Sequence, residues 1–111
     1  MARKRSTNAL PVFVTAKAHG YIQTLKSSRI PINRAYIFGS WAKQKADDDS
    51  DIDLAILSSS FSDWEKQNNA LAKAMRMDFA GIEPHGFHPK DFTPGENLLV
   101  DEILKYGIRI V

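Results

Sequence analysis

The chain has 111 residues, of which 43% are hydrophobic and 25% are charged, and its formal net charge is +2. This composition is that of an ordinary globular domain and excludes a disordered or fibrous chain. The sequence contains no cysteine, which excludes a disulfide scaffold, a thiolate metal site and a cysteine nucleophile.

Residues 1–8 are predicted to form a disordered, basic tail, and residues 9–111 a single domain. For the basic run Arg3-Lys4-Arg5, a solvated terminus is a simpler explanation than contact with a nucleic-acid backbone. No apolar run approaches the ~18 residues needed to cross a bilayer, and the N-terminus lacks the apolar stretch of a signal peptide. The location expected by default is therefore cytoplasmic, without membrane contact.

The first predicted element is a helix from Asn8 to about Ser28, with Pro11 in its first turn. Its apolar residues recur at helical spacing and form one stripe: Val14, Ala18, Ile22 and Leu25. Residues 35–38 then read as a short buried strand. The strand stops at Gly39-Ser40, where a tight turn into a short helix is expected.

Residues 51–57 follow a loop dense in acidic residues and have the composition of a second strand. A capping-box pattern, Ser-x-x-Glu, opens at Ser62 and predicts a helix that ends near Arg76. This helix is expected to place three residues at helical spacing in the core: Trp64, Leu71 and Met75.

Residues 80–87 read as a third strand, which Pro84 places at a sheet edge or a strand end. Residues 98–106 form the last predicted helix, stopped by Gly107, and residues 108–111 a final short strand. This order of elements predicts an α/β or α+β fold, in which helices cover a small mixed sheet mainly on one face.

The strongest chemical signal is Asp51-Ile52-Asp53-Leu54, at the start of the second predicted strand. Alternate side chains of a strand share a face, so Asp51 and Asp53 are expected to point the same way, away from the core. Two neighbouring carboxylates repel each other unless a cation lies between them. Mg²⁺ is a natural occupant, since it prefers one or two carboxylates together with substrate phosphates.

Gly39-Ser40 is expected to supply a phosphate-binding turn beside these carboxylates. A glycine lets the backbone approach a ligand closely, and the amides that follow it bind phosphate oxygens together with the Ser40 hydroxyl. Lys43, one turn later, adds a positive charge. Such a turn next to a metal-binding pair is the equipment of phosphoryl transfer. An Asp-x-Asp pattern alone is also common in solvated acidic loops, but its place at the head of an apolar strand favours the functional interpretation.

Two segments closely resemble the signature of the DNA polymerase beta-like nucleotidyltransferase superfamily, in particular its minimal stand-alone branch (MNT). They are Phe-Gly-Ser-Trp-Ala-Lys at residues 38–43 and Ser-Asp-Ile-Asp-Leu-Ala-Ile-Leu at residues 50–57. The spacing between Gly-Ser and the carboxylates matches the family pattern without a gap, and the resemblance covers nearly the whole chain. It implies a polymerase beta-like fold and a nucleotide and metal site.

The resemblance also implies roles for individual residues. Gly39 and Ser40 would hold the triphosphate, and Asp51 and Asp53 would bind two Mg²⁺ ions, for which Mn²⁺ can substitute. The family's third carboxylate lies on the next strand, where Glu83 is the matching residue and Asp78 a weaker rival. This carboxylate would share the second metal and act as the general base.

Two positions depart from the family pattern. Trp41 stands where an arginine is common, which removes a phosphate contact and offers an aromatic face, and Gln44 replaces a usual glycine, which is expected to stiffen the turn. His85 and His88 suggest a metal clip or a general base near Glu83. Ordinary surface or half-buried histidines are nevertheless the simpler explanation for this pair.

The resemblance implies an enzyme that transfers a nucleoside monophosphate, in the first instance AMP from ATP, to a hydroxyl of a protein or RNA. Members of the minimal branch are often paired with a HEPN-domain toxin, which they neutralise by adding AMP. The resemblance therefore implies a HEPN partner, and the small size of the domain predicts a homodimer or a heteromer, since either would close the open side of the site. The alternative is a binding module that acts as an antitoxin by contact, with little or no transfer. Glu83 within metal reach of Asp51 and Asp53 would favour the enzyme.

Overall fold

The computed structural model describes residues 10–111, so the tail predicted for residues 1–8 lies outside the described residues. In chain order the elements are α1 (Val12–Ser27), β1 (Arg34–Phe38), β2 (Ile52–Leu57), α2 (Trp64–Ala74), the 3₁₀ helix η2 (Met77–Phe79), β3 (Ile82–Phe87), the 3₁₀ helix η3 (Pro89–Asp91), α3 (Leu98–Tyr106) and β4 (Ile108–Arg109). None of the helices within residues 10–111 has the length and apolar character needed to cross a membrane.

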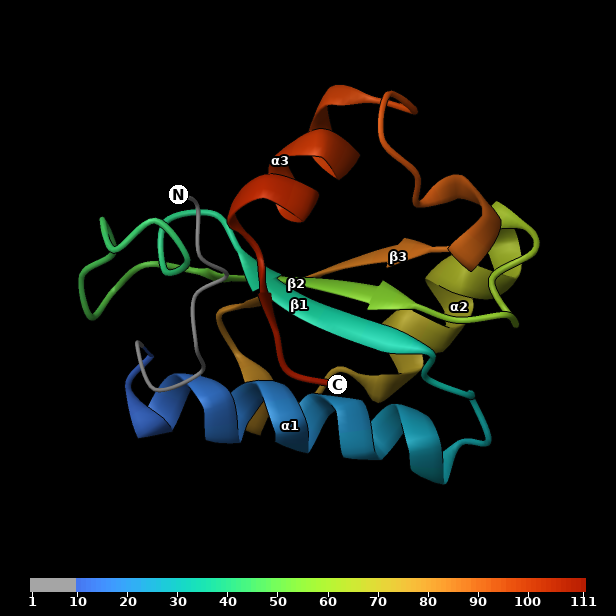
Figure 1. Cartoon of the computed structure of the whole chain (residues 1–111). Coiled ribbons are helices and arrows are strands. Elements are labelled where there is room, and N and C mark those ends of the chain that lie inside the picture. The colour runs from blue at the N-terminus through green and yellow to red at the C-terminus, as the bar shows by residue number, and fades with distance from the viewer. Residues whose placement is uncertain (1–9) are drawn as a thin grey trace.

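The four strands form one mixed sheet in the order β3-β2-β1-β4. β1 runs antiparallel to both β2 and β4, whereas β2 and β3 are parallel. α1 and α2 pack on one face of this sheet, and α3 lies on the other face (Figure 1). The predicted fold class is therefore confirmed, with two helices on one face and one helix on the other.

The apolar stripe predicted for α1 faces the sheet. All four of its residues are buried, and Tyr21 joins them. The helix begins at Val12, because Pro11 has an extended backbone with φ −59° and ψ 147° and occupies the N-cap position; the start predicted at Asn8 lies outside the described residues. Pro11 therefore precedes the first turn instead of lying within it.

Residues of β1 and β2 alternate between two apolar clusters, one on each face. On the α1 face, Ile37, Leu54 and Ile56 are fully buried against the stripe of α1. The cluster on the α3 face is smaller, and its buried members are Tyr36, Phe38, Ala55, Leu57, Phe92, Val100 and Ile103. Asp53 follows the same alternation and lies on the α3 face.

A buried hydrogen bond joins the two helices of the first face. The hydroxyl of Tyr21 donates to the carbonyl oxygen of Leu71 at 2.7 Å, and Tyr21 is fully buried. Leu71 belongs to the last turn of α2, where carbonyl groups have no partner within the helix. Burial raises the pKa of Tyr21 well above its ordinary value, so the hydroxyl keeps its proton and remains a donor.

The start of α2 differs from the prediction by one residue. Asp63 and not Ser62 is the N-cap, because its carboxylate accepts a hydrogen bond from the amide of Lys66 at 2.7 Å. The helix also ends at Ala74 and not near Arg76. Two of the three residues predicted to lie in the core are exposed: Trp64 is 76% and Met75 36% exposed, and Leu71 alone is buried. Trp64 lies in the first turn of α2 and Met75 follows its last residue, whereas the buried residues of this helix lie in its second half.

β3 is an edge strand, as Pro84 predicts. The amides of Ile52 and Ser58 donate to the carbonyl oxygens of Gly81 and Phe87. Odd-numbered residues of β3 therefore turn their backbone groups toward β2, and the backbone of Pro84 faces the free edge. The missing N–H of proline breaks no bond within the sheet at this position.

Candidate active site

Three segments that are distant in sequence meet at one end of the sheet, on the α3 face. β1 ends at Phe38, whose register partner on β2 is Asp53. The register partner of Asp53 on β3 is Glu83. Residues that are paired on neighbouring strands point to the same face, so the register of the sheet places the two carboxylates side by side.

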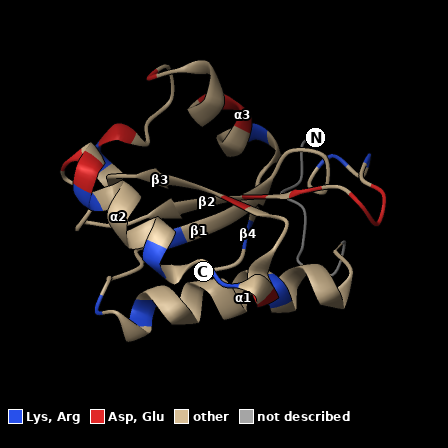
Figure 2. Ribbon diagram, turned by 180° about the vertical axis from the view of Figure 1, so that it is seen from behind, with Lys and Arg blue, Asp and Glu red and all other residues tan. Residues whose placement is uncertain are grey.

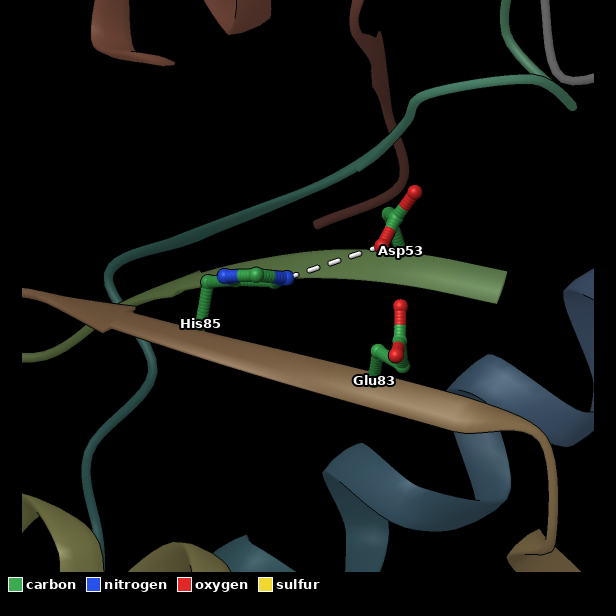
Figure 3. A group of neighbouring side chains, drawn as sticks. All are labelled: Asp53, Glu83 and His85. Carbon is green, nitrogen blue, oxygen red and sulfur yellow. Dashed lines mark ion pairs between the residues drawn. The ribbon is translucent and has the colours of Figure 1, made fainter. Parts of the chain in front are cut away.

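The Asp53 and Glu83 carboxylates form a compact group with the imidazole of His85 (Figure 3). One ligand atom of each residue lies within 4.8 Å of the other two. His85 follows Glu83 by two residues and therefore shares its face. Its Nε2 lies 3.5 Å from Asp53 Oδ1, and the two side chains are 36% and 25% exposed. The group is therefore partly shielded and still open to a ligand.

The closeness of the two carboxylates affects the protonation of Glu83. Asp53 raises the pKa of Glu83 above its ordinary value, first through the hydrogen bond that a protonated Glu83 makes to it and then through charge repulsion. Desolvation and the charge of Asp51 act in the same direction, whereas His85 opposes them. A cation between the carboxylates relieves this repulsion.

Asp51 lies at the rim of this group. It precedes β2 by one residue and is exposed, and its carboxylate is not among the converging ligand atoms found within residues 10–111. It still lies close enough to raise the pKa of Glu83. Asp78, the rival for the third carboxylate, is exposed in η2 and outside the group. Figure 2 shows the acidic stretch that leads from the loop at residues 47–51 into β2.

Gly39 turns the chain away from the sheet next to the carboxylates. Its φ of 73° lies in the left-handed region that favours glycine. A Cβ atom at this position would overlap the carboxylate of Asp53. The sequence predicted that the backbone at Gly39 approaches a ligand closely. In the structure, the group that this backbone approaches is the carboxylate of Asp53.

The short helix predicted after Gly39-Ser40 is a single turn, closed by a Schellman pattern of hydrogen bonds. The amide of Lys45 donates to the Ser40 carbonyl at 2.9 Å, and the amide of Gln44 donates to the Trp41 carbonyl at 3.3 Å. Gln44 occupies the left-handed position of this motif, with φ 59°, where glycine is the usual residue. The departure from the family pattern at Gln44 therefore strains the backbone of this turn.

Two residues at this turn, Lys43 and Trp41, have partners within the fold. Lys43 Nζ lies 3.1 Å from Glu102 Oε1 of α3, so its charge is paired within the fold. Trp41 is only 8% exposed, packs against Phe13, and donates its indole N–H to the Ser50 carbonyl at 3.3 Å. Trp41 is therefore a core residue that holds the acidic loop, and it does not offer an aromatic face to a ligand.

The structure separates the two histidines that the sequence left as ordinary surface residues. His88 lies just after β3, and its Nδ1 accepts a hydrogen bond from the amide of Lys90 at 3.0 Å. His85 is half-buried, as the simpler explanation allows, and its ring faces the carboxylates of Asp53 and Glu83. The signal that identifies it is the strand period of two, which places Glu83 and His85 on one face.

The donor set of the group fits a divalent cation. Asp53 and Glu83 offer carboxylate oxygens, which hard cations prefer, and His85 adds an imidazole nitrogen. The Nε2 atom of His85 is buried and has no hydrogen-bond partner within residues 10–111. Buried polar atoms without partners are rare in proteins, and a cation between these side chains would give this nitrogen a partner.

Comparison with known proteins agrees with this geometry. The family described as "Polymerase beta, Nucleotidyltransferase" matches residues 21–111. No relative among curated protein sequences matches the chain. Among solved structures, a candidate nucleotidyltransferase from Sulfolobus solfataricus has a similar fold, with a TM-score of 0.61 and 18% identity over 82% of this chain and 81% of that chain.

A second similar structure is that of a toxin–antitoxin with AMP-PNP. Its TM-score is 0.58 and its identity 19%, over 83% of this chain and 70% of that chain. At these identities the two structures establish the fold alone, whereas the family match extends from within α1 to the last residue. On that match, the chain belongs to the polymerase beta nucleotidyltransferase family.

Proposed function

We propose that this protein transfers a nucleoside monophosphate, AMP from ATP, to a hydroxyl group of a protein or RNA acceptor in a Mg²⁺-dependent reaction. The observation that carries the proposal is the in-register pair of Asp53 and Glu83, whose carboxylates converge beside the turn at Gly39. Membership of a nucleotidyltransferase family supports the reaction class.

The proposed roles are those that the family resemblance implies for these residues. Asp51 and Asp53 hold two Mg²⁺ ions, and Glu83 shares the second ion and accepts the proton of the attacking hydroxyl. When bound, the ions neutralise charge on the triphosphate. Gly39 and Ser40 receive the triphosphate at the turn that follows β1.

The choice of donor is suggested by one similar structure. That structure is a toxin–antitoxin with AMP-PNP, and AMP-PNP is an analogue of ATP. We therefore propose ATP as the donor. A toxin of the HEPN type is the first acceptor to test, because the resemblance of the sequence to the minimal branch implies this pairing. The side chains of Asp53 and His85 are partly exposed, so a partner protein or a second copy of this chain is proposed to complete the acceptor site.

A second candidate function is a binding module that acts by contact alone. Two observations favour it: Asp51 lies outside the converging group, and Lys43 is paired with Glu102. The position of Glu83 beside Asp53 favours the enzyme, because a binding module has no need for two carboxylates that repel each other.

The test is a transfer assay with Mg²⁺ and each nucleoside triphosphate labelled at the α-phosphate, with and without HEPN-type proteins and RNA. We expect label on one acceptor. Asp53→Asn and Glu83→Gln should each lower the transfer rate by at least ~100-fold, because each would weaken the binding of the cations that neutralise the reacting phosphate.

Asp78→Asn is the matched control, since it makes the same change at an exposed aspartate outside the group. Its transfer rate should equal that of the unchanged protein. Full activity of Asp53→Asn would contradict the assignment of Asp53 to the active site. If no nucleotide labels any acceptor while a partner still binds tightly, the enzyme hypothesis is contradicted and the binding-module hypothesis is favoured.

A further inference from the structure

His85 is held in a fixed orientation that the family roles assigned above do not explain. It lies on β3 between Pro84 and Gly86, and its ring packs edge-on against Phe38 of β1, with ring centres 5.1 Å apart and planes at 64°. This packing and the strand direction together point the ring at the carboxylates (Figure 3). His85 therefore presents Nε2 to the group without rearrangement.

The distance between His85 and Asp53 is close to that between two ligands of one ion. Ligand atoms about 2.1 Å from a shared cation lie ~3.0 Å apart at octahedral angles and ~3.4 Å apart at tetrahedral angles. Nε2 of His85 lies 3.5 Å from Oδ1 of Asp53, and the Glu83 carboxylate lies within 4.8 Å of both. Small side-chain movements are sufficient to bring all three atoms to one ion.

A hydrogen bond within the group does not account for this nitrogen. Nε2 of His85 is buried and has no hydrogen-bond partner within residues 10–111, even though Asp53 is its neighbour. A buried ring nitrogen that has no hydrogen-bond partner and faces two carboxylates is placed as the nitrogen of a metal-binding imidazole would be.

We propose that Nε2 of His85 is a ligand of one of the cations at Asp53 and Glu83, and that this nitrogen shifts the cation preference of the site from Mg²⁺ toward Mn²⁺. The inference rests on the proposed function, because it assumes that the carboxylates bind divalent cations. It assigns to His85 a role in metal choice and not in proton transfer.

The preference follows from ligand chemistry. Mg²⁺ is a hard cation that binds oxygen ligands and gains little from an imidazole. Divalent transition metals bind imidazole nitrogen more strongly, in an affinity order that rises from Mn²⁺ through Co²⁺ to Cu²⁺. Replacing one oxygen ligand by a nitrogen therefore strengthens Mn²⁺ binding relative to Mg²⁺ binding.

The experiment measures metal binding by the full chain, without any assay of activity. Mn²⁺ binding is followed by electron paramagnetic resonance, and Mg²⁺ binding by its competition with Mn²⁺. We expect His85→Asn to weaken Mn²⁺ binding by at least ~10-fold and Mg²⁺ binding by less than ~3-fold. His88→Asn is the matched control, because His88 lies outside the group, and both affinities should stay unchanged.

Pulsed paramagnetic resonance of Mn²⁺ bound to the unchanged protein gives an answer that needs no variant. Coupling to a ¹⁴N nucleus is expected if His85 binds the ion. Absence of this coupling would overturn the inference, as would equal losses of Mn²⁺ and Mg²⁺ affinity in His85→Asn, which indicate that the ring only orients Asp53.

The same titrations separate the inference from the proposed function. If Asp53→Asn abolishes Mn²⁺ binding and His85→Asn does not affect it, the proposed function is retained and the role of His85 in metal binding is contradicted. A chain that binds neither cation would contradict both the metal-dependent function and the inference.

Discussion

The two faces of the sheet are made by the same strands but differ in what they carry. The α1 face is covered by one continuous apolar cluster, in which the hydroxyl of Tyr21 is satisfied by Leu71. The α3 face has a smaller apolar cluster, and at the end of β1 it carries the carboxylates of Asp53 and Glu83. The α1 face therefore supplies most of the apolar burial that stabilises the fold, and the α3 face accommodates carboxylates that repel each other.

This division follows from the size of the domain. In a domain of this size the core and the site share the same strands. Neighbouring residues of β2 show the consequence: Leu54 is fully buried on the α1 face, whereas Asp53 is partly exposed on the α3 face. The division can be tested by substitutions on each face.

The largest effect is expected for the two neighbours on β2. Leu54→Ala removes a fully buried side chain and should lower the free energy of unfolding by about 2–5 kcal/mol. Asp53→Asn should leave this free energy unchanged or raise it slightly, because it removes repulsion with Glu83. Chemical denaturation measures both. If Asp53→Asn lowers the free energy of unfolding as much as Leu54→Ala does, the proposed difference between the two faces is contradicted.

A smaller loss is expected for the buried hydroxyl on the α1 face. Tyr21→Phe leaves the carbonyl of Leu71 without its partner and should lower the free energy of unfolding by about 1–2 kcal/mol. Tyr36→Phe is the matched control on the α3 face, where the hydroxyl accepts a partly buried bond from Arg34. Thermal unfolding should rank the two variants in this order; equal effects would mean that the faces do not differ in polar burial.

A gain in stability is expected at the turn that follows β1. Gln44→Gly relieves the left-handed backbone at φ 59° and should raise the free energy of unfolding by roughly 0.5–1 kcal/mol, after the greater chain entropy of glycine is subtracted. Gln44→Ala keeps the Cβ atom and should give no gain. Equal stability of the two variants would show that the turn is not strained.

The smallest effect concerns pH and the site on the α3 face. The pKa of Glu83 is raised in the folded state, so its stabilising contribution is full below the ordinary pKa and is lost as the pH rises through the raised value. In metal-free buffer, the melting temperature of Glu83→Gln should therefore rise relative to that of the unchanged protein as the pH increases above about 4, near the ordinary pKa of a glutamate. Added Mg²⁺ should remove this advantage of the variant in melting temperature. A difference in melting temperature that does not change with pH would contradict the raised pKa of Glu83.

Much of the fold is predictable from the sequence because local signals are strong. Apolar spacing and Gly107 predict α3 at residues 98–106, as observed, and Pro84 predicts an edge strand. The exposure of Trp64 is not predictable in this way. Helical spacing identifies which side chains lie on one side of α2. It does not show how much of that side is covered by the rest of the fold.

The site is predictable only in part, for a similar reason. The carboxylates of Asp53 and Glu83 are recognisable from strand position and family pattern, and the structure brings them together. The pairing of Lys43 with Glu102 and the meeting of His85 with Asp53 depend on contacts between distant elements. Their geometry depends on the packing of α3 and the register of β3, which no local pattern encodes.

Pro84 has a consequence for how this protein meets other chains. Its backbone faces the free edge of β3, so that edge lacks an N–H donor at its centre. At Gly86, the next outward-facing position, the side chain of Gln67 packs close to the backbone. A foreign strand that added to this edge would find an interrupted ladder, which disfavours strand-swapped dimers and fibrils. A partner is therefore expected to recognise this edge through side chains and not by extending the sheet.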